Sequence, residues 1–193
     1  AYLQRIFETF DNDQFFSFHE SIYSYSLRIK KKINFEANTY ARSQFSKMLD
    51  IDKIELKSTY KFPYTINPLN TIDFLPKTLY EKEESINNYE NEIINEVANM
   101  DNVKFWTRNI DRQGFKINGF INHYPDFIIV TKTGNIVVLE TKGDHLTASD
   151  KIELGRIWEA KAGKGYKYFL VYNDRSEKDA YRKEEFLEIM REL

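Results

Sequence analysis

The stretch FINHYPDFIIVTKTGNIVVLETKGDH, residues 120–145, decides the fold. Its two apolar runs, FIIV and IVVL, flank the turn signal TGN at 133–135, and this pattern predicts a β-hairpin. One acid, Asp126, precedes the first run, and the triplet ETK at 140–142 closes the second. Acids at the ends of buried strands cost stability unless something pairs with them, so these positions are candidates for a functional site.

The length of the turn decides whether these side chains converge. Side chains alternate across a strand, so Glu140 and Lys142 share one face and Thr141 lies on the other. A two-residue loop sets Asp126 opposite Thr141, on the wrong face. A three-residue loop at 133–135 sets it opposite Lys142, on the right face, and a β-bulge would also correct the register. The sequence permits the convergence without forcing it.

The residue types at these positions suit a divalent metal ion. Carboxylates from Asp126 and Glu140, with the backbone carbonyl of Thr141, are hard oxygen ligands of the kind that Mg²⁺ or Mn²⁺ prefers. A bound metal lowers the pKa of its water and stabilises charge on a phosphoryl oxygen. The ammonium of Lys142 can orient the attacking water or stabilise the transition state. We therefore expect metal-assisted hydrolysis of a phosphodiester; the alternative is that Asp126 only begins a strand and Glu140-x-Lys142 is a solvated strand end.

A further acid is expected from the clearest helical pattern, over residues 78–101. Its apolar residues form one stripe, and Glu90 occupies an inward phase of that stripe. Glu90 could supply a further metal ligand directly or through water, and we include it among the catalytic and metal-binding candidates. The alternative is that Glu90 lies at the edge of the stripe and reaches water. Glu92 and Glu96 on the same helix would also serve.

The order of predicted elements indicates an α/β or α+β fold around a mixed central sheet flanked by helices. We expect a domain at 78–193 and an N-terminal helical extension or connector at 1–77. The expected helices are 13–33, 35–50, 78–101, 149–162 and 177–193, and the expected strands are short pieces within 51–72, then 103–109, 115–120, the two arms of the hairpin and 166–172.

Composition limits the class of protein. The chain has 193 residues, 41% hydrophobic and 30% charged, which is typical of a globular protein. Its net charge of -2 gives no global attraction to nucleic acid, so a DNA contact would need a local basic patch or bound cations. Cysteine is absent, which fits a reducing cytosol, and no apolar run is long enough to span a bilayer. The chain begins with Ala1 and no signal peptide is visible, so we expect an excised piece of a longer cytoplasmic protein; a trimmed Met or tag is the alternative.

The hairpin resembles the PD-(D/E)xK nuclease superfamily, with Pro125-Asp126 as the PD half and ETK at 140–142 as the ExK half. The flanking segments VKFWTRN (103–109), YPDFII (124–129) and VLETKG (138–143) are similar to the C-terminal endonuclease domain of the restriction subunit of type III restriction enzymes and related DEAD/DEAH-type helicases. The resemblance covers about residues 78–172.

The resemblance implies a restriction-endonuclease-like fold and a bacterial or archaeal source. It also implies that Asp126 and Glu140 ligate Mg²⁺, which Mn²⁺ can replace, that Lys142 is catalytic, and that an upstream glutamate, here Glu90, completes the site. The implied partners are double-stranded DNA, a helicase/ATPase region of the same parent chain and a modification methyltransferase subunit.

Three lysines after the hairpin are candidates for contacting DNA phosphates: Lys151, Lys161 and Lys164. The alternative is a solvated helix face. Two other functions compete with a restriction nuclease. One is a repair or recombination nuclease of the same fold, and the other is a catalytically degenerate domain that docks DNA or the motor.

Overall fold

The computed structural model describes residues 8, 9, 11–72 and 75–193, without the side chains of residues 12, 13, 15, 16, 19 and 20. The chain divides into two compact units, Ala1–Lys53 and Ile54–Leu193. This division falls earlier than the boundary expected between residues 77 and 78. Residues 54–77 belong to the second unit because they contact its core. For example, the indole nitrogens of Trp106 and Trp158 donate to the carbonyls of Pro76 and Lys57.

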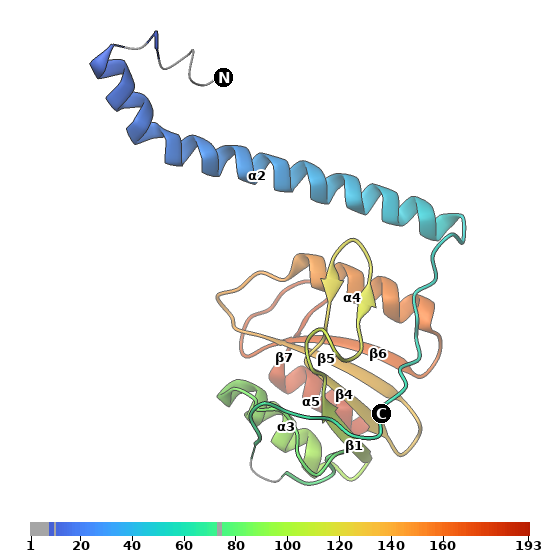
Figure 1. Cartoon of the computed structure of the whole chain (residues 1–193). Coiled ribbons are helices and arrows are strands. Elements are labelled where there is room, and N and C mark those ends of the chain that lie inside the picture. Colours follow the sequence, from blue (N-terminus) through green and yellow to red (C-terminus); the bar gives the residue numbers. More distant parts are fainter. Residues whose placement is uncertain (1–7, 10, 73–74) are drawn as a thin grey trace. The chain divides into compact units, whose positions relative to one another are not determined.

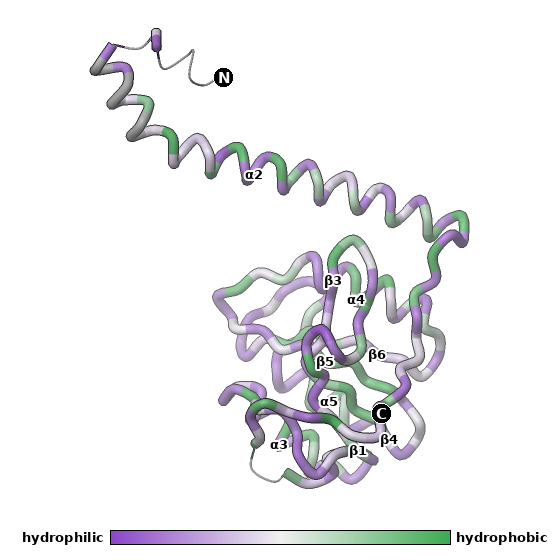
Figure 2. The backbone as a smooth tube through the Cα atoms, viewed as in Figure 1, coloured by the Kyte–Doolittle hydropathy of each residue, from purple (hydrophilic) through white to green (hydrophobic). Residues whose placement is uncertain are grey.

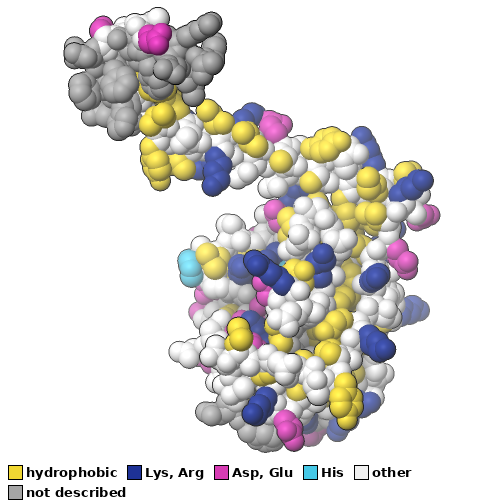
Figure 3. Space-filling view, viewed as in Figure 1, with side chains coloured by type: hydrophobic (Ala, Val, Ile, Leu, Met, Phe, Trp, Pro, Cys, Tyr) yellow, Lys and Arg dark blue, Asp and Glu magenta, His cyan; other side chains and the backbone are white. Residues whose placement is uncertain are grey.

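The first unit contains a single long helix, α2 (Asn12–Asp50). The expectation of two helices, at 13–33 and 35–50, was wrong. No glycine or proline interrupts this stretch, and the lysine run that suggested a helix end continues as helix, with Lys32 paired to Glu36 one turn later at 2.5 Å. The hydropathy colouring in Figure 2 alternates along α2 without a continuous apolar stripe. Large apolar side chains such as Tyr23 and Phe35 are exposed, and Figure 3 shows such side chains between charged ones along this helix.

The second unit is built on a five-stranded mixed sheet (Figure 1). Its strand order is β1-β4-β5-β6-β7, antiparallel between β1, β4 and β5 and parallel between β5, β6 and β7. The strands are β1 (Val103–Arg108), β4 (Phe127–Thr131), β5 (Ile136–Lys142), β6 (Tyr166–Tyr172) and β7 (Tyr181–Arg182). A separate two-stranded ladder, β2 (Ile117–Asn118) with β3 (Asn122–His123), lies in the connection from β1 to β4.

The turn between β4 and β5 has three residues, one of the two lengths that the sequence left open, but it lies one position earlier than the three-residue turn considered at 133–135. The pairing runs from Phe127 opposite Leu139 to Val130 opposite Ile136, and the backbone N–H of Thr131 donates to the carbonyl of Asn135. The loop is therefore 132–134 rather than 133–135. Because both loops have an odd number of residues, the parity of the strand is unchanged, and the observed register continued by one residue sets Asp126 opposite Glu140.

Helices cover both faces of the sheet. One face packs against α3 (Asn88–Asn99) and α5 (Lys183–Glu192), where Val137 and Leu139 of β5 join the main apolar core. The opposite face carries α4 (Ser149–Ala162), which packs on β6. Strand alternation therefore directs Glu140 toward the α4 side. In the described part of the chain the fold is thus mixed α+β, with four helices and a five-stranded mixed sheet.

Several elements are shorter than the sequence predicted. Within residues 54–72, all of which the structure describes, the expected strands are replaced by irregular chain with one isolated bridge at Thr71; prolines at 63 and 68 remove backbone donors there. The helix expected at 78–101 begins only at Asn88, behind a capping box between Asn87 and Glu90. The strand expected at 115–120 is limited to β2, and the two-residue β7 precedes α5 where helix was expected.

Among the described residues, no helix combines the length and the apolar character that a membrane crossing requires.

The close packing of α4 on β6 at Gly155 predicts the effect of one substitution. A Cβ at Gly155 of α4 would lie 2.1 Å from a ring carbon of Tyr168, whose side chain is fully buried. We expect Gly155→Ala to lower the free energy of unfolding by about 1 to 3 kcal/mol, although alanine is the better helix former. Chemical denaturation would measure this. Lys161→Ala, at an exposed position of α4, is the control and should change stability by less than about 0.5 kcal/mol. A Gly155→Ala protein as stable as the parent would contradict this packing.

Candidate active site at the end of the central strands

Asp126 lies at the point where β4 begins and binds the next strand directly. Its Oδ2 accepts hydrogen bonds from the backbone N–H of Thr141 at 2.7 Å and from the Thr141 hydroxyl at 2.9 Å. The paired part of β4 ends opposite Leu139, so the carboxylate occupies the place of the missing strand beside Thr141. These hydrogen bonds hold the Asp126 carboxylate beside Thr141, the residue between Glu140 and Lys142.

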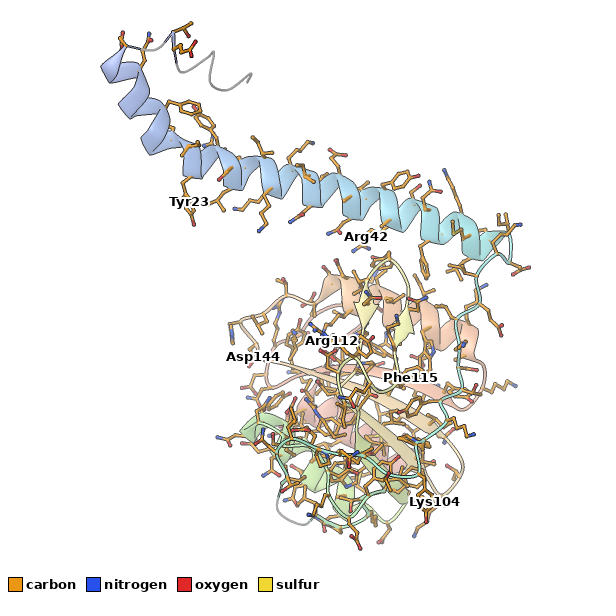
Figure 4. All side chains as sticks on the ribbon, viewed as in Figure 1. Tyr23, Arg42, Lys104, Arg112, Phe115 and Asp144 are labelled. Atoms are coloured by element: carbon orange, nitrogen blue, oxygen red, sulfur yellow. The ribbon has the colours of Figure 1, made fainter. Side chains whose placement is uncertain are left out.

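Asn109 holds the backbone on the other side of Asp126. Its side-chain nitrogen donates to the carbonyl of Pro125 and to that of Phe115, each at 2.8 Å, and its backbone N–H donates to the carbonyl of Asp126 at 2.8 Å. Phe115, which Figure 4 labels, packs in turn on Trp158 of α4. The two ring centroids are 5.6 Å apart. The long connection from β1 to β4 is thus tied at both ends, and Asp126 is held by backbone contacts as well as by its own carboxylate.

Glu140 is a buried acid with two cations on the same oxygen. Lys151 of α4 donates to its Oε1, and the Nζ of Lys142 lies 4.0 Å from that oxygen. The other oxygen, Oε2, is buried and has no hydrogen-bond partner among the described residues. A buried carboxylate oxygen without a donor is costly, and it marks a place where a cation, a proton or water would be stabilised.

The electrostatic surroundings of Glu140 oppose its negative charge. Burial is the largest influence and the neighbouring charge of Asp126 is the second, and together they raise the pKa of Glu140 to about 8. Lys151 and Lys142 act in the opposite direction without cancelling them. Asp126 is therefore close enough for its charge to affect the ionisation of Glu140.

Arg108, at the end of β1, links the acids on the other side of the sheet. Its Nη1 lies 3.1 Å from Oε1 of Glu90 and 3.3 Å from Oδ1 of Asp126. The remaining oxygen of Glu90 accepts from the backbone N–H of Asn87 as part of the helix cap. Burial raises the pKa of Glu90, and Arg108 lowers it in part. Arg108 thus holds Glu90 and Asp126 together as an acid–base–acid chain.

The structure separates Glu90 from the two other glutamates of α3. Glu90 is buried beside Arg108, whereas Glu92 and Glu96 are largely exposed and lie 3.7 and 3.8 Å from Lys183 and Arg191 at the other side of the helix. Of the three candidates, only Glu90 reaches the group around Asp126.

The three lysines proposed for DNA contact lie in two different places. Lys151 pairs with Glu140 and so belongs to the site itself. Lys161 is exposed in the last turn of α4, roughly 15 Å along the helix from Lys151, and Lys164 is exposed just beyond the end of α4. Their contact with DNA stays a prediction.

The donor set fits a metal ion in part. Among the described residues, no three acidic or histidine side chains are grouped so that they could hold a metal. Asp126 and Glu140 remain as a pair, and the carbonyl of Thr141 points to the same side as its N–H, toward Asp126, because both groups of a strand residue face one neighbour. Both oxygens of Glu90 are engaged, and so are both oxygens of Asp126, with Arg108 on Oδ1 and Thr141 on Oδ2, so direct ligation by either acid stays a prediction. The unpaired Oε2 of Glu140 and hard oxygen donors suit Mg²⁺ or Mn²⁺.

Sequence reasoning missed two residues that shape this site. Arg108 was noticed only as part of the VKFWTRN segment, and its even spacing from Trp106 along β1 could have placed it toward α3. Glu83 falls within the helix expected at 78–101, which contains several acids. Its carboxylate instead lies buried before α3 and accepts from the Thr107 hydroxyl and the Arg108 N–H, each at 3.0 Å. No sequence signal distinguishes Glu83 from its acidic neighbours.

A buried pair lies beneath the lysines. Nε2 of His123 is 2.8 Å from the hydroxyl of Tyr168, and its Nδ1 is buried without a partner among the described residues. Burial, aided by the charges of Lys151 and Lys142, lowers the pKa of His123 to about 3. His123 is therefore neutral at physiological pH and adds no charge to the site.

Glu83 gives the protein a measurable pH dependence. Burial raises the pKa of Glu83 to about 7, so the folded protein binds this proton more tightly than the unfolded chain. The associated stability is complete below about pH 4.5 and is lost as the pH rises through about 7. We expect Glu83→Gln to unfold with a flatter pH dependence between these limits, measured by urea titration at several pH values. Glu81→Gln, at an exposed position, should keep the parent slope; equal slopes for all three proteins would refute the assignment.

Comparison with known proteins adds no relative: neither a family model, nor a curated protein, nor a solved structure matches the chain.

Proposed function

We propose that residues 54–193 form a metal-dependent nuclease domain that hydrolyses phosphodiester bonds of double-stranded DNA. One observation carries this proposal. The carboxylate of Asp126 is bound to the backbone of Thr141, between Glu140 and Lys142, and one buried oxygen of Glu140 has no partner in the part of the chain that the structure describes. Two acids that could hold a metal ion, beside a lysine that could stabilise developing negative charge, support metal-assisted hydrolysis.

Each residue of the site would have its own role in the hydrolysis. Asp126, Glu140 and the Thr141 carbonyl would hold the ion, and Glu90 would support Asp126 through Arg108. When bound, Mg²⁺ supplies positive charge that polarises the phosphate and acidifies water. Lys142, 4.0 Å from Glu140, would orient the water that adds to phosphorus and stabilise the charge that develops there. The bond from phosphorus to one sugar oxygen then breaks, leaving a phosphate end and a hydroxyl end.

The finer assignment rests on the sequence resemblance. We propose that the mixed sheet with α3, α4 and α5 is a restriction-endonuclease-like fold. We further propose that the domain serves a type III-like restriction subunit in the bacterial or archaeal cytoplasm, with a helicase region of the same parent chain and a modification methyltransferase as partners. The strand order, with an antiparallel pair carrying the acids and a parallel strand beyond it, supports the fold proposal. A repair nuclease of the same fold remains the first alternative.

A non-cutting role is the second alternative, and one feature favours it. Each acid of the site already has a cation within reach: Arg108 lies beside Glu90 and Asp126, and Lys151 beside Glu140. A site neutralised in this way could hold the fold together or dock DNA without hydrolysis.

Cleavage of plasmid DNA distinguishes these functions. We expect Mg²⁺- or Mn²⁺-dependent nicking that Asp126→Asn and Lys142→Ala reduce by roughly 100-fold or more. Asparagine at 126 keeps an oxygen for the Thr141 N–H but presents its NH2 group to Arg108 in place of Oδ1, so thermal unfolding of the variant is measured beside cleavage to separate lost catalysis from unfolding. Asp101→Asn, at an exposed acid outside the site, is the matched control and should cut like the parent.

One set of results would contradict the nuclease proposal. Binding of DNA without cleavage under either metal, with no change on substitution of Asp126 or Lys142, would reject the nuclease and favour the docking role.

A further inference from the structure

Two lysine ammonium groups lie near one oxygen of the Glu140 carboxylate, whereas its other oxygen has no hydrogen-bond partner among the described residues. Lys151 donates to Oε1 of Glu140, and Lys142 lies 4.0 Å from the same oxygen. These lysines come from different elements, Lys142 from the end of β5 and Lys151 from the first turn of α4. Two ammonium groups therefore compete for one carboxylate oxygen.

The loop between β5 and α4 fixes the start of the helix that carries Lys151. The carbonyl of Leu146 accepts from the Tyr172 hydroxyl and from Nη1 of Arg175, at 3.2 and 2.7 Å. The helix then begins with the N–H of Ile152 donating to the carbonyl of Ala148 at 2.9 Å. Because the loop is anchored to the end of β6, Lys151 stands over Glu140 as a consequence of the fold.

The two lysines differ in their freedom to move. The Lys142 side chain is 22% exposed and extends from a paired strand, whereas the Lys151 side chain is 31% exposed at the open start of a helix. A lysine has four methylene groups and three rotatable donors, so its ammonium can exchange one oxygen for another a few ångströms away. Lys151 is the lysine that can leave Glu140 without disturbing the sheet.

We propose, on the basis of the nuclease function above, that Lys151 is a second basic residue of the catalytic centre and that it competes with the divalent ion for Glu140. Glu140 and Asp126 would hold the ion, and repulsion between like charges would then favour departure of the Lys151 ammonium from Oε1 of Glu140. This ammonium would pair with a nonbridging oxygen of the scissile phosphate and stabilise the negative charge of the transition state. Lys151 would thus act on the reacting phosphate, beyond a general attraction for DNA.

Because of this competition, we expect Lys151→Ala to strengthen Mn²⁺ binding and to slow DNA cleavage. Lys151→Ala removes a positive charge beside Glu140, so Mn²⁺ should bind the DNA-free protein roughly tenfold more tightly. The same variant should cleave DNA roughly 100-fold more slowly at saturating Mn²⁺, because the phosphate loses a partner. Calorimetry or electron paramagnetic resonance measures Mn²⁺ binding without any reliance on activity. Lys151→Arg, which keeps the charge, should restore parent-like metal affinity and part of the cleavage rate.

Controls separate this proposal from the nuclease proposal itself. Lys161→Ala, on the same helix but far from the acids, should leave Mn²⁺ affinity unchanged. Equal Mn²⁺ affinity in the parent and Lys151→Ala, or weaker binding in the variant, would overturn the role of Lys151 while leaving a metal-dependent nuclease intact. Absence of Mn²⁺ binding to the parent and to Lys151→Ala alike would instead overturn the nuclease function. Thermal unfolding of each variant excludes misfolding as the cause.

Discussion

The hydrogen bonds from Thr141 to the carboxylate of Asp126 hold the candidate site together. The pairing of β4 with β5 stops at Leu139, and β5 continues for three more residues, Glu140–Lys142, paired with the parallel strand β6. The N–H of Thr141 on the β4 side would be left without a partner in a buried place, which is costly. The Asp126 carboxylate accepts this N–H, and the hydrogen bond holds the carboxylate in a fixed position. One interaction thus completes the sheet and sets the acid beside Glu140, so the stability of the strand end and the geometry of the site cannot be changed separately.

Charge balance explains how three acids persist in and around a packed core. Glu90, Asp126 and Glu140 face Arg108, Lys142 and Lys151, three negative against three positive groups. The charges are not paired one to one. Arg108 lies beside both Glu90 and Asp126, whereas Lys142 and Lys151 both lie beside Glu140. Burial still opposes ionisation of Glu90 and Glu140. Groups arranged in this way contribute little net stability, and their retention in a buried setting is more typical of a functional site than of a structural one.

The sequence predicted the centre of the fold better than its edges. The hairpin, α4 and β6 were expected almost within their observed bounds, because apolar runs of strand length and a glycine after the helix are strong local signals. The turn was placed one residue late, yet its odd length preserved the face on which Asp126 lies. The long helix α2 was divided because a run of lysines resembles a helix end, and the irregular chain before α3 was given strands because aromatic residues alternate there. The contacts of Arg108 and Glu83 depend on neighbours distant in the sequence, and local patterns carry no information about such contacts.

The alternation of β1 and β5 divides the site into two halves. Arg108 shares a face with Trp106, toward α3, and therefore meets Glu90. Glu140 lies on the opposite face, toward α4, and therefore meets Lys151. Asp126 is beyond the paired end of β4, so its two oxygens can serve both halves, one toward Arg108 and one toward Thr141. For this reason Asp126 is the acid on which both a bound cation and its supporting network would depend, and Glu90 contributes through Arg108 rather than by reaching across the sheet.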